Sequence, residues 1–149
     1  MTQKRIYVDV PYLLTTNTKD RRQYFKNIHI ANALANVIVE KGKELKCNIF
    51  CFQIMPNHLH IVMQTRLSNV STFMQRVKAC FYKRIREQCN WNIKFWQKGF
   101  YHGLLEDEDA IYRSVRYLGN NPGVAGLSDK YFAWPYAFLD EQSINQYIS

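Results

Sequence analysis

Hydrophobic positions recur along this chain with two periods, one typical of helices and one typical of strands. Apolar residues return at three- and four-residue steps from about Asn27 to Lys46 and from about Val70 to Gln88, which predicts two amphipathic helices. Residues 12–16 are β-branched and apolar, and Asn48–Met55 and His58–Thr65 are rich in apolar residues. These three segments predict strands.

The last two of these strands are separated only by Pro56 and Asn57, so we expect an antiparallel hairpin. Residues 91–105 are rich in aromatic side chains and predict a further strand. A third helix should begin in the acidic run 106–109, where carboxylates stabilise the positive end of a helix dipole, and end before Pro122.

The order strand, helix, hairpin, helix, strand, helix predicts an α+β fold in which helices pack on an antiparallel sheet with the hairpin at its centre. A chain of 149 residues is long enough for one hydrophobic core, so we expect a single domain over residues 1–149. Beyond Gly126 the pattern is lost except for an apolar patch. Residues 128–149 are therefore predicted to be an irregular C-terminal tail.

Composition narrows the choice of partners. No apolar run reaches about eighteen residues, so we expect a cytoplasmic protein with no membrane segment. The four cysteines form no CxxC pair and are predicted to be free thiols. The net charge of +8 favours a polyanionic partner, although charge alone does not separate a nucleic acid from an anionic membrane surface.

Part of this charge lies on the second predicted helix, on the sides that do not face the core. We consider these basic side chains candidate DNA-binding residues; an ordinary solvated helix face is the alternative. They are Arg76, Lys78, Lys83, Arg84 and Arg86.

Two histidines, His58 and His60, are separated by one residue of the predicted hairpin. Residues i and i+2 of a strand point to the same face, so the two imidazoles should lie side by side. Such a pair is half of a metal site, although it also occurs as a structural or surface pair. His102 could approach the same region, but a surface or hydrogen-bonded histidine is the simpler interpretation.

The third helix offers groups that could complete the site. Tyr117 and Asn121 are four residues apart, so a phenol and an amide oxygen can project from one helix face. The alternatives are a packed aromatic residue and a helix-capping amide before Pro122.

Three segments, in this order, resemble the single-tyrosine HUH transposases, and within them the REP-associated tyrosine transposases. They are Met55-Pro56-Asn57-His58-Leu59-His60, Phe95-Trp96-Gln97-Lys98-Gly99-Phe100, and Arg116-Tyr117-Leu118-Gly119-Asn120-Asn121-Pro122 followed by Ala125-Gly126-Leu127. The chain departs from the family pattern at Glu106, where an arginine is expected, and at Gly119.

The resemblance implies a ferredoxin-like or RRM-like sheet of the HUH endonuclease type. It implies that His58, His60 and Asn121 bind a divalent metal, Mg²⁺ or Mn²⁺, and that Tyr117 is the nucleophile. The implied enzyme is a DNA endonuclease and transposase that cleaves single-stranded DNA beside a hairpin. Its tyrosine becomes attached to the 5′ phosphate and a 3′ hydroxyl is released.

Two other functions remain open. The chain could be a non-catalytic module that binds structured single-stranded DNA or RNA. It could also be a hydrolytic metalloenzyme, which the absence of Asp or Glu next to His58 and His60 disfavours. The resemblance is compatible with a monomer and with a homodimer whose tyrosine helix serves the partner. The target sequence, the preferred metal and the biological role are not encoded in a recognisable form.

Overall fold

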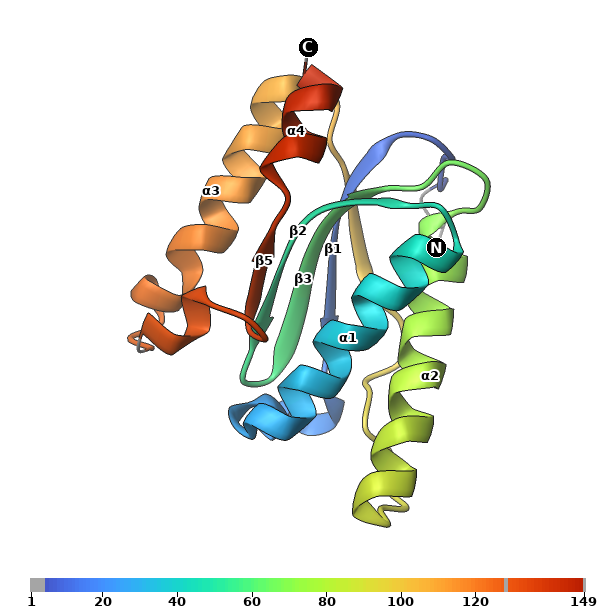
Figure 1. The fold of residues 1–149 in the computed structure, drawn as a ribbon, viewed down its shortest axis with the longest axis vertical. Helices are drawn as coiled ribbons and strands as arrows, with labels where there is room; N and C mark the ends of the chain where they lie inside the picture. Colours follow the sequence, from blue (N-terminus) through green and yellow to red (C-terminus); the bar gives the residue numbers. More distant parts are fainter. Residues whose placement is uncertain (1–4, 128, 149) are drawn as a thin grey trace.

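The computed structural model of the protein describes residues 5–127 and 129–148, and the described residues form one antiparallel sheet between two helical layers (Figure 1). In their order across the sheet, the strands are β4 (Tyr101–Leu104), β1 (Pro11–Asn17), β3 (His58–Gln64), β2 (Asn48–Met55) and β5 (Ala137–Leu139). The β2–β3 hairpin is central and antiparallel, as predicted. The α+β fold expected from the sequence is confirmed.

Helices cover both faces of the sheet (Figure 1). One face carries α1 (Ile28–Glu44) and α2 (Val70–Cys89), and the other carries α3 (Glu108–Val124) and α4 (Glu141–Ile148). Three short 3₁₀ helices are η1 (Lys19–Arg21), η2 (Tyr24–Lys26) and η3 (Asp129–Phe132).

The alternation of side chains along β3 divides its residues between the two layers. Leu59, Ile61 and Met63 are buried in the larger core, which lies under α1 and α2. Val62 belongs to the smaller core, which also contains Ile111 and Leu118 of α3. His58 and His60 share the parity of Val62, so they face the α3 side of the sheet.

The aromatic segment 91–105 forms less strand than predicted, because only Tyr101–Leu104 pair with β1. Phe95 instead inserts between Phe25, Phe81 and Trp96, with ring centroids 4.9–5.5 Å away. Burial of these rings explains the aromatic composition without requiring a regular strand.

The third helix is longer than predicted and contains Pro122 in its last turn. A proline there removes only the hydrogen bond to the Leu118 carbonyl, and the next turn is closed by Ala125 N–H, which donates to the Asn121 carbonyl at 3.0 Å. Pro122 is buried, so its packing offsets the missing bond. Asn121 is consequently still helical.

The prediction of an irregular tail over residues 128–149 was wrong for the described part of that range; residues 128 and 149 themselves lie outside the described residues. The segment contains η3, β5 and α4. β5 pairs with β2, with Phe138 opposite Phe52 and their rings stacked 5.3 Å apart. Both regular elements are too short to give a periodic pattern, and it is the pairing with β2 that orders the strand.

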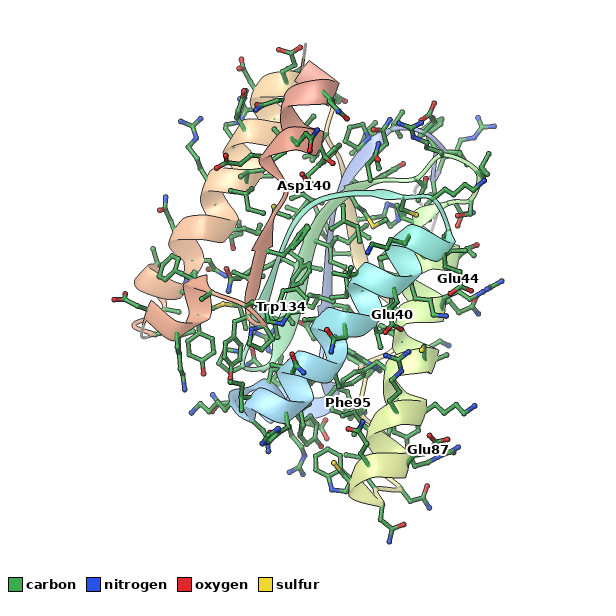
Figure 2. All side chains as sticks on the ribbon, viewed as in Figure 1. Glu40, Glu44, Glu87, Phe95, Trp134 and Asp140 are labelled. Atoms are coloured by element: carbon green, nitrogen blue, oxygen red, sulfur yellow. The ribbon has the colours of Figure 1, made fainter. Side chains whose placement is uncertain are left out.

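The same segment also contacts the first helical layer. Trp134 Nε1 donates to Asn32 Oδ1 of α1 at 3.2 Å, and its position beside α1 can be followed in Figure 2. Within the described residues, no helix is both long enough and apolar enough to cross a bilayer.

Candidate active site

The two histidines of β3 form the centre of a candidate active site on the α3 side of the sheet. The ring centroids of His58 and His60 lie 4.8 Å apart with the rings nearly perpendicular. The side-by-side arrangement predicted from their spacing is therefore confirmed.

Each imidazole is oriented by a hydrogen bond at Nδ1. His58 Nδ1 lies 2.7 Å from Asn57 Oδ1, and His60 Nδ1 lies 2.8 Å from Thr15 Oγ1 on the neighbouring strand. The amide oxygen of Asn57 can only accept, so a neutral His58 carries its proton on Nδ1 and keeps a lone pair on Nε2. His60 Nε2 is buried and has no hydrogen-bond partner among the described residues. The Nε2 atoms are thus the ones left to bind a ligand.

The surroundings favour the neutral form of both rings. Burial lowers the pKa of His58 to about 4, and the nearby positive charge of Arg21 contributes to the shift. Burial and the charge of His58 lower the pKa of His60 to about 4. Both imidazoles are therefore neutral at pH 7, which is the form that binds metal ions.

Tyr117 of α3 reaches this pair from the same chain. The centroid of its ring lies 5.8 Å from that of His60, with the two planes at 72°. The side chain is 53% exposed, so an external strand can approach it. A solvent-exposed phenol therefore lies next to the pair of neutral imidazoles.

Two hollows adjoin the site. One, of about 300 Å³, lies between α3 and β1 and is lined in part by Tyr117, Arg113 and Leu13. The other, of about 430 Å³, lies along β1 and includes Thr15 and Asn17, the residues paired with His60 and His58 in the sheet. They provide space for an extended ligand next to Tyr117 and next to the β1 residues that pair with the histidines.

Asn121 lies one turn after Tyr117 on α3 and is half-buried. Its role as a metal ligand remains a prediction. Among the described residues, no three His, Cys, Asp or Glu side chains are grouped to hold a metal ion. A metal at the histidine pair would therefore need an amide, hydroxyl or phosphate oxygen to complete its coordination.

The five basic residues predicted to bind DNA lie across the sheet from the histidines, on α2. Lys78 Nζ donates to the carbonyls of Gln97 and Gly99, and burial lowers its pKa to about 8. Arg84 forms an ion pair with Glu40, whose position on α1 is labelled in Figure 2. The remaining three, Arg76, Lys83 and Arg86, have exposed side chains. Binding of DNA by this helix remains a prediction.

Sequence reasoning missed the residues that orient the histidines. Thr15 could have been found, because strand alternation places it on one face of β1, but its pairing with His60 depends on the register of a distant strand. Asn57 was interpreted only as a turn residue. His102, in contrast, lies on the other face of the sheet against Tyr12 and Phe100, which supports the simpler interpretation made from the sequence.

Comparisons with known proteins agree with this geometry. Residues 7–121 match the transposase family described as IS200-like, a range that includes His58, His60, Tyr117 and Asn121. The protein is thus a transposase by family, built on an α+β fold. It belongs to the IS200-like transposases, and its resemblance to the REP-associated tyrosine transposases is confirmed.

Individual relatives are distant in sequence. A Haemophilus influenzae protein assigned as a REP-associated tyrosine transposase is 21% identical over 137 residues, covering 85% of this chain and 77% of that protein. The structure of a REP-associated tyrosine transposase bound to a REP hairpin superposes with a TM-score of 0.76 at 16% identity, covering 100% of this chain and 87% of that one. A Deinococcus radiodurans protein assigned as a transposase gives a TM-score of 0.57 at 18% identity, over 80% of this chain and 97% of that one. The structural likenesses establish the shared fold.

Proposed function

We propose that this protein is a metal-dependent transposase that cleaves and rejoins single-stranded DNA through a covalent bond to Tyr117. The observation that carries the proposal is the position of Tyr117, whose ring lies beside His60 within one chain and is still open to solvent. A phenol that only stabilised the fold would be expected to be more deeply buried.

His58 and His60 would hold the metal through Nε2, with Asn121 as the proposed third ligand. The buried and unpartnered Nε2 of His60 fits this role, because an unsatisfied buried nitrogen is costly unless it binds something. When bound, Mg²⁺ or Mn²⁺ would polarise a phosphate and neutralise the charge that develops during cleavage. Asn57 and Thr15 would keep the two rings in the orientation that this requires.

In the proposed reaction, the Tyr117 oxygen attacks a DNA phosphorus atom. A tyrosyl O–P bond forms, the bond to the 3′ oxygen breaks, and the phenolic proton is transferred, directly or through solvent, to the released 3′ hydroxyl. Attack by a DNA 3′ hydroxyl on the phosphotyrosine reverses these changes and joins two strands. Because phenolate is a better leaving group than an alkoxide, the intermediate conserves the energy of the broken bond.

The proposed substrate is single-stranded DNA that carries a hairpin. Support comes from the net charge of +8, from the hollows beside the histidines, and from the fold shared with a protein that was solved with a REP hairpin. Whether the protein works as a monomer or a homodimer is a separate matter, but the placement of Tyr117 beside His60 in one chain favours catalysis within a single subunit.

The test is incubation of the protein with Mn²⁺ and a library of single-stranded hairpins, followed by sequencing of the DNA that becomes covalently attached. We expect an adduct with the wild type and with Tyr112→Phe, a matched control that changes another exposed tyrosine of α3, and none with Tyr117→Phe. Binding without any adduct would favour the non-catalytic module. Cleaved DNA with a free 5′ phosphate and no attached protein would favour hydrolysis.

A further inference from the structure

The segment that follows β1 is held in an unusual conformation beside the histidine pair. Asp20 and Arg21 are consecutive non-glycine residues with left-handed backbones, at φ 56° and φ 55°. A residue with a Cβ is strained in this region, so the conformation persists only where neighbouring contacts impose it.

Thr18 supplies most of these contacts. It is fully buried, its N–H donates to the Asn57 carbonyl at 3.0 Å, and its hydroxyl lies within hydrogen-bonding distance of the carbonyls of Asn57 and Arg22. Lys19 N–H donates to the Phe95 carbonyl at 2.8 Å. The segment is therefore fixed both to the turn that precedes His58 and to the aromatic segment around Phe95.

This anchoring places the Arg21 guanidinium at the His58 end of the site. Its Nη1 donates to Asn17 Oδ1 at 3.1 Å, and Asn17 is the residue directly opposite His58 in the β1–β3 ladder.

Within the described residues, most of the guanidinium N–H donors of Arg21 have no hydrogen-bond partner. The residue is exposed, and none of the salt bridges among the described residues involves it. A guanidinium has five N–H donors arranged to bind two oxygens of one anion, and within the described part of the chain Asn17 is the partner that occupies one of them. Arg21 therefore provides a fixed positive charge at the His58 end of the site.

We propose that Arg21 binds a phosphate of the DNA strand that enters the site formed by His58, His60 and Tyr117. This inference rests on the proposed function for the identity of the strand. The contact is made with the phosphodiester and not with a base, so Arg21 positions the strand without selecting its sequence. The cost of the left-handed backbone is consistent with a side chain that must be held in one place before DNA arrives.

The neighbouring Arg22 provides a matched control. It is also exposed, and its carbonyl rather than its side chain takes part in the anchoring described above. Arg21→Gln and Arg22→Gln remove the same charge from adjacent positions. A difference in DNA binding between the two variants therefore depends on where the charge lies and not on the net charge. Thermal unfolding of both variants shows whether either change disturbs the fold.

The first measurement is the salt dependence of binding to a random-sequence pool of single-stranded DNA, with a chelator present so that no covalent bond forms. Removing one cation that neutralises a phosphate lowers the slope of log affinity against log salt by about 0.7 for a single strand. We expect this decrease for Arg21→Gln and an unchanged slope for Arg22→Gln. An unchanged slope for Arg21→Gln would overturn the inference.

The second measurement uses the hairpin that becomes attached to the wild type, with the attached phosphate replaced by a neutral methylphosphonate. Arg21→Gln should weaken binding of the normal hairpin about tenfold, as expected for a charge-assisted hydrogen bond, and binding of the methylphosphonate hairpin much less. Arg21→Lys should recover part of the affinity. Equal weakening on both hairpins would show that Arg21 only supports the fold.

The two proposals can fail separately. A wild type that forms no adduct, while Arg21→Gln still shows the reduced salt slope, would refute the proposed function and retain a DNA-binding role for Arg21. An adduct whose amount and affinity are unaffected by Arg21→Gln would refute the inference and retain the function.

Discussion

His60 is the residue on which the site depends most, because it contacts the other components directly. It is 6% exposed, its ring lies beside both His58 and Tyr117, and its Nδ1 is bound by Thr15. A buried imidazole normally has a partner at each nitrogen, and His60 Nε2 has none among the described residues. The structure thus holds one nitrogen in a defined position and leaves the other for a ligand.

The hydrogen bond between Thr15 Oγ1 and His60 Nδ1 should control metal affinity. Thr15→Val keeps the shape of the side chain but removes the partner of His60 Nδ1, so Mn²⁺ affinity measured by titration calorimetry should fall about ten- to hundredfold. Thr16→Val is the control, because Thr16 Oγ1 donates to the Gly99 carbonyl and not to a histidine. Equal affinities for the two variants would contradict the orienting role of Thr15.

The lowered pKa values of the histidines predict how stability depends on pH. In the metal-free protein both have a pKa of about 4, against 6.5 in an unfolded chain, so the unfolded state binds more protons between these values. Stability should therefore be complete above about pH 6.5 and decrease as the pH falls towards 4. The decrease is on the order of 3 kcal/mol for each ring, because each pKa falls from 6.5 to about 4 and one pKa unit corresponds to about 1.4 kcal/mol.

Urea denaturation in the presence of a chelator measures this dependence. Other acidic groups also titrate in this range, so the comparison is with a variant carrying His58→Gln and His60→Gln, whose profile should be flatter. Parallel profiles for the two proteins would show that the histidines are not the cause.

Among the elements, α3 and the β2–β3 hairpin determine the geometry of the site. The hairpin presents both histidines on one face, and α3 packs on that face through Ile111 and Leu118. Tyr117 precedes Leu118 and lies at the edge of this contact, which explains how it is exposed and still lies beside His60. The position of Tyr117 therefore depends on how α3 seats on the sheet.

Substitution of two helical glycines by alanine should affect the stability of the protein differently. A Cβ added to Gly119 of α3 meets nothing within 4 Å, so Gly119→Ala should stabilise the protein by about 0.5–1 kcal/mol through helix propensity. A Cβ on Gly42 of α1 would lie 2.5 Å from Ile49 Cδ1, so Gly42→Ala should be neutral or destabilising. Chemical denaturation of both variants tests this, and destabilisation by Gly119→Ala would show that the α3 surface is not as open as described.

The sequence predicted the hairpin and the placement of its two histidines better than it predicted the contacts around them. The hairpin followed from Pro56-Asn57 between two apolar segments, and the shared face of His58 and His60 followed from a period of two. Tyr117, in contrast, was identified from the family resemblance, because an exposed aromatic residue on a helix has no distinctive pattern. Relations between distant segments, such as Asn17, the hydrogen-bond partner of Arg21, lying opposite His58, were not predictable without the register of the strands.

At the scale of the whole molecule, the sheet separates two kinds of surface. The histidine pair faces α3, which carries Tyr117, whereas the predicted DNA-binding residues lie on α2 on the opposite side of the sheet (Figure 1). A hairpin that contacted both surfaces would have to pass around an edge of the sheet. Arg21 is the last residue of η1, which follows β1, and it is the basic residue that we place next to the histidines.

The exposed cations of α2 should contribute to affinity without taking part in the reaction. Replacing Arg76, Lys83 and Arg86 with glutamine should lower the salt slope of hairpin binding by about 0.7–0.9 for each phosphate that is no longer neutralised, with the rate of adduct formation at saturating DNA unchanged. Arg84→Gln is the comparison, because its guanidinium is already paired with Glu40. An unchanged slope for the triple variant would restrict the DNA-binding surface to the α3 side.

The most direct test of the proposed chemistry is to identify the amino acid that becomes attached to DNA. After incubation of the protein with Mn²⁺ and a hairpin that it captures, nuclease digestion leaves a short nucleotide on the protein, and peptide mass spectrometry locates it. We expect a nucleotide on Tyr117 joined through its 5′ phosphate, and none on the other nine of the ten tyrosines. Attachment at a different residue, or cleavage that leaves no nucleotide on the protein, would contradict the proposed role of Tyr117.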